Sequence, residues 1–203
     1  MSDLVVGADG LARCRWGASS PEYLRYHDEE WGRPVHGDDR LYERITLEAF
    51  QSGLSWLTIL RKREGFRAAF AGFAIEAVAA FDQADVDRLL ADPGIVRNRA
   101  KVAAALTTAR AAAALHQAEG DGALDRLVWS HAPSGTSTRP VSLAEVPART
   151  TGSAALTKAL KARGFVFVGP TTMYATMQAC GLVDDHLVGC HRARQEIARV
   201  VSP

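Results

Sequence analysis

The feature that most constrains the fold of this chain is an alanine-rich run, NRAKVAAALTTARAAAAL, from Asn98 to Leu115. Alanine has the highest intrinsic helix propensity, so the run predicts one long helix. The sequence DPGIVRNR lies directly before it, and its Pro-Gly pair indicates a tight turn. We therefore expect a helix that starts immediately after a sharp turn.

Helical patterns also dominate the rest of the chain. The segments with helical character, most of them bounded by an aspartate or a glycine, are residues 38–52, 75–91, 153–164 and 171–180. We expect residues 75–91 to divide into two short helices at Asp82, and Ser153 to cap the helix that it begins. The segment FVFVG (165–169) favours β structure but is too short to form a sheet alone, and residues 131–152 form the only long loop. Because strands do not alternate with helices, the sequence predicts an all-α fold.

The composition is that of an ordinary globular protein. The 203 residues suit one good-sized domain, with 47% hydrophobic and 23% charged residues. Three cysteines are too few for a disulfide framework. The N-terminus lacks the apolar core of a signal peptide, and no run approaches the length of a membrane span. We therefore expect a cytoplasmic protein without a membrane partner, while the net charge of +1 neither indicates nor excludes a polyanionic one.

A basic group of residues surrounds the predicted Pro-Gly turn. Arg97, Arg99 and Lys101 follow Gly94 within seven positions of the chain. Where two helices flank such a turn, backbone N–H groups and nearby cations can hold a phosphate without reading a base. Basic clusters also occur simply as solvated helix faces, and the pattern alone leaves both interpretations open.

Two pairs of potential metal ligands lie at opposite ends of the chain. His186 and Cys190 stand four residues apart, and Cys14 and His27 are candidate partners. Four N and S ligands would form a closed Cys2His2 site, whose role is structural because it leaves no position for water. Such a site would join both ends of the chain and stabilise the fold by closing a long loop. Spacing alone also allows a buried cysteine beside ordinary histidines, and His191 is an alternative ligand.

A glutamate occupies the apolar face of the helix predicted over residues 38–52. Glu48 falls on the same stripe as Leu41 and Ile45, where burial would raise the pKa of its carboxyl group. Five aromatic residues precede or follow it: Trp16, Tyr23, Tyr26, Trp31 and Trp56. One acid among aromatic rings suits a flat ligand that is cationic or donates hydrogen bonds. The alternatives are a helix turned so that Glu48 pairs with an arginine, and aromatic residues that only fill the core.

Several segments, in matching order and spacing, carry a resemblance to a known family. The stretches CRW, YLRYHDEEWG, LYERITLEAFQSGLSWLTILRKRE, GIVRNRAK, ALKARGFVFVGPTTMYATMQACGLVDDH and GCH resemble 3-methyladenine DNA glycosylase I of the constitutive type. The likeness extends from about Cys14 to Cys190. It implies an all-α member of the helix-hairpin-helix glycosylase superfamily, with these parts: an N-terminal extension (1–13), a glycosylase domain (14–192) with its helix-hairpin-helix at about 85–110, and a C-terminal tail (193–203).

The resemblance implies roles for individual residues. The expected catalytic residue, which recognises the base, is Glu48. The expected substrate-binding residues are the aromatic residues Tyr23, Tyr26, Trp56, Trp16 and Trp31. The residues expected to contact DNA are Gly53, Leu54, Gly94, Arg97, Arg99 and Lys101. The ligands expected to hold one structural zinc ion are Cys14, His27, His186 and Cys190.

The implied activity is base-excision repair of alkylated double-stranded DNA by a monomer. Methylation at N3 of adenine makes the base cationic and weakens its N-glycosidic bond, so the enzyme has mainly to extrude and select the base before hydrolysis leaves an abasic site. Glu48 would accept a hydrogen bond from the exocyclic amine while Trp56 and a tyrosine enclose the ring. The alternatives are a non-catalytic DNA-binding module, a catalytic metalloenzyme, which four protein ligands disfavour, and a glycosylase with another lesion preference.

Overall fold

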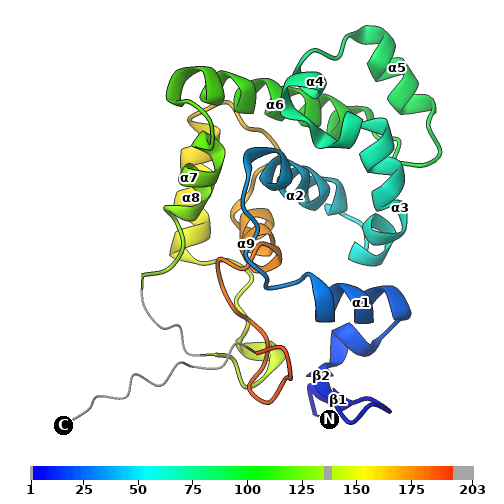
Figure 1. Ribbon diagram of the computed structural model, residues 1–203, viewed down its shortest axis with the longest axis vertical. Coiled ribbons are helices and arrows are strands. Elements are labelled where there is room, and N and C mark those ends of the chain that lie inside the picture. Colours follow the sequence, from blue (N-terminus) through cyan, green and yellow to red (C-terminus); the bar gives the residue numbers. More distant parts are fainter. Residues whose placement is uncertain (1, 135–138, 194–203) are drawn as a thin grey trace.

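The computed structural model describes residues 2–134 and 139–193, and within them the fold is mostly helical (Figure 1). The α-helices are α1 (Pro21–Glu29), α2 (Asp38–Gln51), α3 (Trp56–Ala69), α4 (Ile75–Ala79), α5 (Gln83–Ala91), α6 (Arg99–Glu119), α7 (Ala123–Trp129), α8 (Thr151–Lys161) and α9 (Pro170–Ala179). Single turns of 3-10 helix occur at Arg15–Ala18, Ala71–Phe73 and Leu143–Glu145. The expectation that helices dominate is confirmed. The expected C-terminal tail lies outside the described residues from 194 onward.

A small two-stranded sheet lies at the N-terminus, where the sequence predicted no strand. Strand β1 (Leu4–Val6) pairs antiparallel with β2 (Ala12–Cys14), so that Leu4 is the partner of Cys14. Each strand has only three residues, too few for an alternating pattern to be recognised. The predicted all-α class holds for the helical part of the described chain, and this short hairpin is an addition that the sequence analysis did not include.

Helices α2 and α6 form the centre of the helical part. Helix α6 packs against α2, α4, α5 and α7, and α2 also contacts α3 and α9 (Figure 1). Helix α6 begins after Asn98, whose side chain accepts a hydrogen bond from the N–H of Lys101 (3.1 Å), and it ends before Gly120. The alanine-rich run is thus helical as predicted. The helix continues about one turn beyond Leu115 because no breaker occurs before the glycine.

The Pro-Gly turn between α5 and α6 packs against α3. A Cβ atom on Gly65 in α3 would come within 2.5 Å of the carbonyl oxygen of Gly94, so only glycine permits this approach of two backbones. The ammonium group of Lys62 donates a hydrogen bond to the carbonyl of Pro93 (2.6 Å). These two contacts fix the Pro-Gly turn against α3.

Two helix starts show how capping sets the boundaries. Helix α5 begins with a capping box between Asp82 and Asp85, which separates it from α4 as predicted. Helix α8 is capped by Thr150 and not by Ser153, because each of these two side chains accepts a hydrogen bond from the other's backbone N–H (3.1 and 2.9 Å). The prediction for Ser153 is thus wrong by three residues. The segment FVFVG forms no strand in the structure.

The two ends of the described chain meet. The β1–β2 hairpin and the segment after α9 lie at the same end of the molecule (Figure 1), and the N–H of His191 donates a hydrogen bond to the carbonyl of Ala12 (2.8 Å). Gly189 also lies against the side chain of Leu4. This contact places Cys14 beside residues 186–190. None of the described helices is long and apolar enough to cross a membrane.

Candidate functional site

A cavity of about 440 Å³ opens beside the C-terminal half of α2. It is lined by Glu48 and by all the aromatic residues that the sequence predicted for a pocket, so the tertiary structure brings this set together. The sequence analysis missed six further lining residues: Gln51, Leu143, Val146, Ala175, Gln178 and Asp185. Gln51 follows Glu48 by three residues on the same helix and could have been found from helical spacing. The others come from distant segments and carry no local signal.

The carboxyl group of Glu48 is buried in the wall of this cavity. The residue is 6% exposed, as its position on the apolar stripe of the helix predicted. Burial raises the pKa of Glu48 from its ordinary value of 4.5 to about 8, and the charge of Arg44 opposes this change only in part. No hydrogen bond from the described residues contributes to this pKa. The carboxyl oxygens can therefore accept hydrogen bonds from a ligand.

Arg44, one turn before Glu48, has another carboxylate as its hydrogen-bond partner. Glu30 accepts a hydrogen bond from Arg44 (3.1 Å) and two from Arg63 (2.6 and 2.8 Å). Although burial acts to raise the pKa of Glu30, these two guanidinium groups lower it. Because Arg44 is already paired with Glu30, its positive charge lowers the pKa of Glu48 only in part.

Aromatic rings form the walls around Glu48. The ring centroids of Tyr26 and Trp56 lie 5.5 Å apart, and Trp16 meets Trp31 edge-on at 4.9 Å. The indole N–H of Trp56 is buried and has no hydrogen-bond partner among the described residues. A bound ligand could satisfy this donor. A flat cationic ring in the cavity would meet aromatic faces and one carboxyl group.

The first turn of α3 is held against the pocket by two side chains. The hydroxyl oxygen of Tyr23 accepts a hydrogen bond from the N–H of Leu57 (3.1 Å), and Ser55 caps the helix by accepting one from the N–H of Thr58 (3.2 Å). Both bonds satisfy backbone donors that a helix N-terminus leaves unpaired. They fix the orientation of Trp56, the first residue of the helix.

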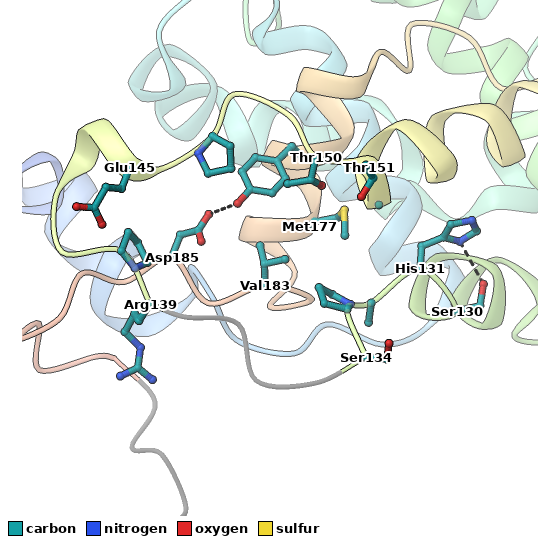
Figure 2. Close-up of a pocket in the computed structure, with 16 residues that line it drawn as sticks. Ser130, His131, Ser134, Arg139, Glu145, Thr150, Thr151, Met177, Val183 and Asp185 are labelled. Atoms are coloured by element: carbon teal, nitrogen blue, oxygen red, sulfur yellow. Dashed lines mark hydrogen bonds between the residues drawn. The ribbon is translucent and has the colours of Figure 1, made fainter.

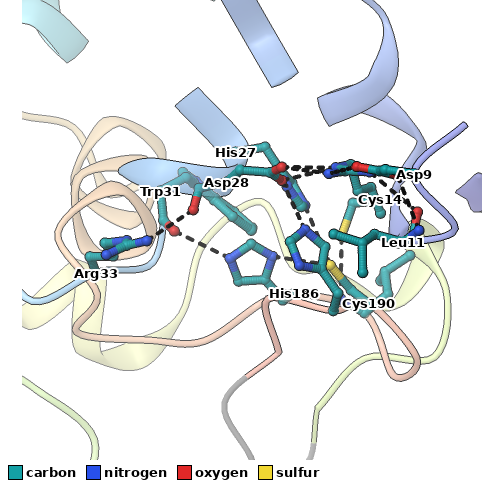
Figure 3. Close-up of polar contacts among 12 residues, drawn as sticks. Asp9, Leu11, Cys14, His27, Asp28, Trp31, Arg33, His186 and Cys190 are labelled. Carbon is teal, nitrogen blue, oxygen red and sulfur yellow. Dashed lines mark hydrogen bonds and ion pairs between the residues drawn. The ribbon is translucent and has the colours of Figure 1, made fainter. Parts of the chain in front are cut away.

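The four predicted metal ligands converge at the junction of the two ends of the chain (Figure 3). The Sγ atom of Cys190 lies 3.4 Å from Nε2 of His27 and 3.6 Å from Nδ1 of His186. Together with Sγ of Cys14, all four ligand atoms lie within 4.8 Å of one another, and all four residues are buried. Tetrahedral zinc with bonds of about 2.0–2.3 Å separates its ligand atoms by distances of this order, so the donor set fits such an ion.

The second nitrogen of each histidine is held by a neighbour. Asp28 accepts a hydrogen bond from Nδ1 of His27 (2.8 Å), and the carbonyl of Trp31 lies 3.2 Å from Nε2 of His186 (Figure 3). Each contact leaves the other ring nitrogen facing the cluster, which is the usual arrangement around a metal. His191, the alternative ligand, contacts Asp28 (3.0 Å) and lies outside the four-residue cluster.

Asp28 is itself held by the N-terminal hairpin. Arg13 on β2 donates hydrogen bonds to both carboxylate oxygens of Asp28 (2.8–3.1 Å) and also contacts Asp9. Although burial acts to raise the pKa of Asp28, the bonds from Arg13 and His27 hold it well below its ordinary value. Asp28 is thus an anionic acceptor for His27.

A second, larger cavity of about 560 Å³ shares the lining residue Asp185 with the first (Figure 2). Asp185 lines both cavities and accepts hydrogen bonds from the hydroxyl of Tyr174 (2.6 Å) and the amide of Gln178 (2.7 Å). The larger cavity contains none of the predicted pocket residues. Its lining consists of loop residues, the start of α8 and two residues of α9, Tyr174 and Met177. Asp185 is the residue that the two cavities share.

The residues predicted to contact DNA lie at two turns. Five of them belong to the turn after α2 or to the segment from the Pro-Gly turn to the start of α6: Gly53, Leu54, Gly94, Arg97 and Arg99. Leu54 is 41% exposed, although leucine is normally buried. Lys101 differs from the others, because its ammonium group donates hydrogen bonds to the carbonyls of Phe50 (2.9 Å) and Ser52 (2.5 Å).

Comparisons with known proteins agree on one family. A family model described as methyladenine glycosylase matches residues 16–193. Over 183 residues the chain is 48% identical to DNA-3-methyladenine glycosylase 1 of Escherichia coli (strain K12), covering 89% of this chain and 96% of that protein. A crystal structure of 3-methyladenine DNA glycosylase I is 46% identical and superposes with a TM-score of 0.84, covering 90% of this chain and 100% of that one. A variant of 3-methyladenine DNA glycosylase I in complex with 3-methyladenine is 34% identical, with a TM-score of 0.83 over 90% of this chain and 98% of the other.

Proposed function

Because this chain belongs to the methyladenine glycosylase family, we propose that it hydrolyses the N-glycosidic bond of 3-methyladenine in alkylated DNA and leaves an abasic site. The observation that carries the proposal is the carboxyl group of Glu48, which is buried among aromatic rings without a hydrogen-bond donor of its own. The solved complex of a relative with 3-methyladenine supports the same choice of base.

The chemistry explains why one carboxylate is sufficient. A purine methylated at N3 and still attached to the sugar carries a positive charge, and it leaves as a neutral base, so protonation by a strong general acid is unnecessary. Glu48 would accept a hydrogen bond from the exocyclic amine, and its negative charge would stabilise the cationic ring between Trp56 and a tyrosine. A purine that lacks this donor edge would leave the buried carboxyl group unpaired, which gives selectivity.

The raised pKa of Glu48 couples base binding to proton release. With a pKa of about 8, the carboxyl group of the empty pocket is mostly protonated at neutral pH. The cationic base favours the carboxylate, so its binding expels the proton. We therefore expect kcat/KM for excision to increase with pH up to about 8.

The turn after α2 would serve the extrusion of the base. An enzyme that reacts at a buried glycosidic bond has to rotate the nucleotide out of the stack, which leaves a gap in the duplex. Gly53, with φ of +78°, allows the chain to turn sharply after α2, and the exposed Leu54 stands two residues before the pocket residue Trp56. We assign to Leu54 the role of occupying that gap.

The segment from α5 to α6 would hold the DNA backbone as a helix-hairpin-helix. Its Pro-Gly turn is rigidly packed on α3, and the exposed Arg97 and Arg99 flank the first turn of α6. Backbone N–H groups and arginines at such a helix start suit a phosphate and carry no base specificity. One extruded base occupies one pocket, so a single chain suffices for the reaction on double-stranded DNA.

The Cys2His2 cluster would hold one structural zinc ion. Its ligands are Cys14, His27, His186 and Cys190, and the ion would neutralise the two thiolates while leaving no position for water. Its contribution would be to fasten the N-terminal hairpin to the segment after α9. Both segments carry or adjoin residues that line the base pocket, so the ion would stabilise the pocket without taking part in the reaction.

Base release from methylated DNA tests the proposed function. Duplex DNA treated with a methylating agent is incubated with the purified protein, and the released bases are separated by chromatography. The expected result is free 3-methyladenine, with 7-methylguanine retained on the DNA. Release of several methylated purines would contradict the selectivity argument, and absence of release by folded, DNA-binding protein would refute the enzymatic assignment.

A further inference from the structure

The ammonium group of Lys101 binds the end of α2 instead of projecting from the DNA-facing helix. Lys101 lies in the first turn of α6, and Nζ donates hydrogen bonds to the backbone carbonyls of Phe50 (2.9 Å) and Ser52 (2.5 Å). The side chain is partly buried, and this burial lowers the pKa of Lys101. The contact joins two helices that are distant in sequence.

The end of α2 has a physical need for such a cation. The last four carbonyl groups of a helix have no partner within the helix, and its C-terminus carries a partial negative charge. Helix α2 contains no basic residue in its last turn. Lys101 supplies the missing donor from α6, so the end of α2 is capped by a different part of the fold.

The capped segment carries the turn that we assign to base extrusion. Ser52, Gly53 and Leu54 follow α2, and the turn is closed by a hydrogen bond from the N–H of Leu54 to the carbonyl of Gln51 (2.7 Å). Glu48 lies one turn earlier on the same helix. The position of the exposed Leu54 relative to the pocket therefore depends on how the end of α2 is held.

We propose that Lys101 is a positioning residue that fixes the Ser52–Leu54 turn to the first turn of α6, and that it is not a phosphate ligand. The contact would keep two parts of the proposed DNA-binding surface in a fixed relative position: Arg97 and Arg99 at the start of α6, and Leu54, which precedes the pocket residue Trp56 by two positions. The expected effect on excision rests on the proposed function. The contact between Lys101 and the end of α2 is independent of that function. It also replaces the expectation from the sequence that Lys101 binds DNA directly.

Three variants separate positioning from phosphate binding. Lys101→Met keeps the length of the side chain and helix propensity but removes the donors, whereas Lys101→Arg retains donors that can reach two carbonyls. Arg97→Ala removes an exposed cation that has no hydrogen bond or ion pair with α2. Hydrogen exchange of the Leu54 amide, which donates to the carbonyl of Gln51, is measured without DNA, and DNA affinity and single-turnover excision are measured over a range of salt concentrations.

The expected results differ for each variant. In Lys101→Met, exchange of the Leu54 amide becomes about tenfold faster and single-turnover excision falls by about tenfold, while the salt dependence of DNA binding keeps its slope. Lys101→Arg restores most of both properties. Arg97→Ala leaves exchange in the turn unchanged and lowers the salt slope by about one.

Two results would overturn the proposal. A salt slope for Lys101→Met that falls by about one, with unchanged exchange in the turn, would make Lys101 a phosphate ligand. Faster exchange without any loss of excision would show that the contact does not position the turn for the reaction. Because the exchange experiment needs neither DNA nor activity, failure of the glycosylase assignment would be seen separately, as absence of base release by the unsubstituted protein.

Discussion

Replacement of Glu48 by glutamine should make the protein more stable at neutral pH while impairing its activity. The carboxyl group is 6% exposed and lacks a hydrogen-bond donor among the described residues, and burial raises its pKa to about 8. In the unfolded chain the carboxyl group of Glu48 has its ordinary pKa of 4.5. Between about pH 4.5 and pH 8, the carboxyl group of Glu48 is therefore mostly protonated in the folded state and mostly ionised in the unfolded state.

The sign of the effect follows from this difference. Because the folded-state pKa is above the unfolded one, the favourable contribution of Glu48 is complete below pH 4.5 and is lost as the pH rises towards 8. At about 1.4 kcal/mol for each pH unit, Glu48 should lower the free energy of unfolding by about 3 kcal/mol at pH 7 relative to its contribution below pH 4.5. Glutamine has nearly the same shape and stays neutral, so the free energy of unfolding of Glu48→Gln should not decrease in this way as the pH rises.

Urea denaturation of both proteins at pH 5 and pH 7 measures the effect. The stability of Glu48→Gln relative to the parent should increase by about 2.5 kcal/mol between the two values of pH. The other ionisable groups contribute equally to the pH dependence of both proteins, so their contributions cancel in the difference between the two free energies of unfolding. Glu64→Gln is the matched control, because Glu64 is exposed on α3 and its ion pair with Arg67 lies at the surface, so its loss should change the parent's pH dependence little. A difference between Glu48→Gln and the parent that does not vary with pH would refute the argument from burial.

The same substitution tests the role of Glu48 in base recognition. A hydrogen bond to a charged acceptor contributes about 1.5–3 kcal/mol, so loss of the carboxylate should reduce kcat/KM for 3-methyladenine release by about 10- to 100-fold. The increase of kcat/KM towards pH 8 should disappear with it. A stabilised variant with unchanged base release would mean that Glu48 is buried for a reason other than binding.

Three further predictions concern the Cys2His2 cluster and the pocket wall. Cys190→Ser should abolish binding of the proposed zinc ion, measured by elemental analysis of both proteins, and lower Tm by about 5–10 °C, since a ligand at 100 times its Kd contributes about 2.7 kcal/mol. Equal zinc content in both proteins would exclude Cys190 as a ligand. Asp28→Asn should weaken zinc binding by about 10- to 100-fold in competition with a chelator, because His27 loses its anionic partner, and an unchanged affinity would contradict this. Tyr23→Phe should reduce the free energy of unfolding by about 1 kcal/mol in urea, because the N–H of Leu57 loses its acceptor; equal stability would show that water replaces the hydroxyl.

The parts of the fold that local sequence determines were predicted well. Helix propensity and capping act over a few residues, so the alanine-rich α6, the break at Asp82 and the stop at Gly53 could be read directly. The same helical spacing placed Glu48 on a buried face. The cap of α8 was assigned to Ser153 instead of Thr150 because both hydroxyl residues suit the position, and the reciprocal pairing is visible only in the folded backbone.

The sequence by itself therefore determined that the chain is mainly helical, that an acid lies on an apolar stripe and, through the resemblance, which family it belongs to. Only the tertiary structure decided which distant groups meet. It paired β1 with β2, placed His191 on Asp28 outside the Cys2His2 cluster, and directed Lys101 to the end of α2. The physical reason is that propensity and periodicity are properties of neighbouring residues, whereas each of these contacts depends on the packing of segments that are separated along the chain.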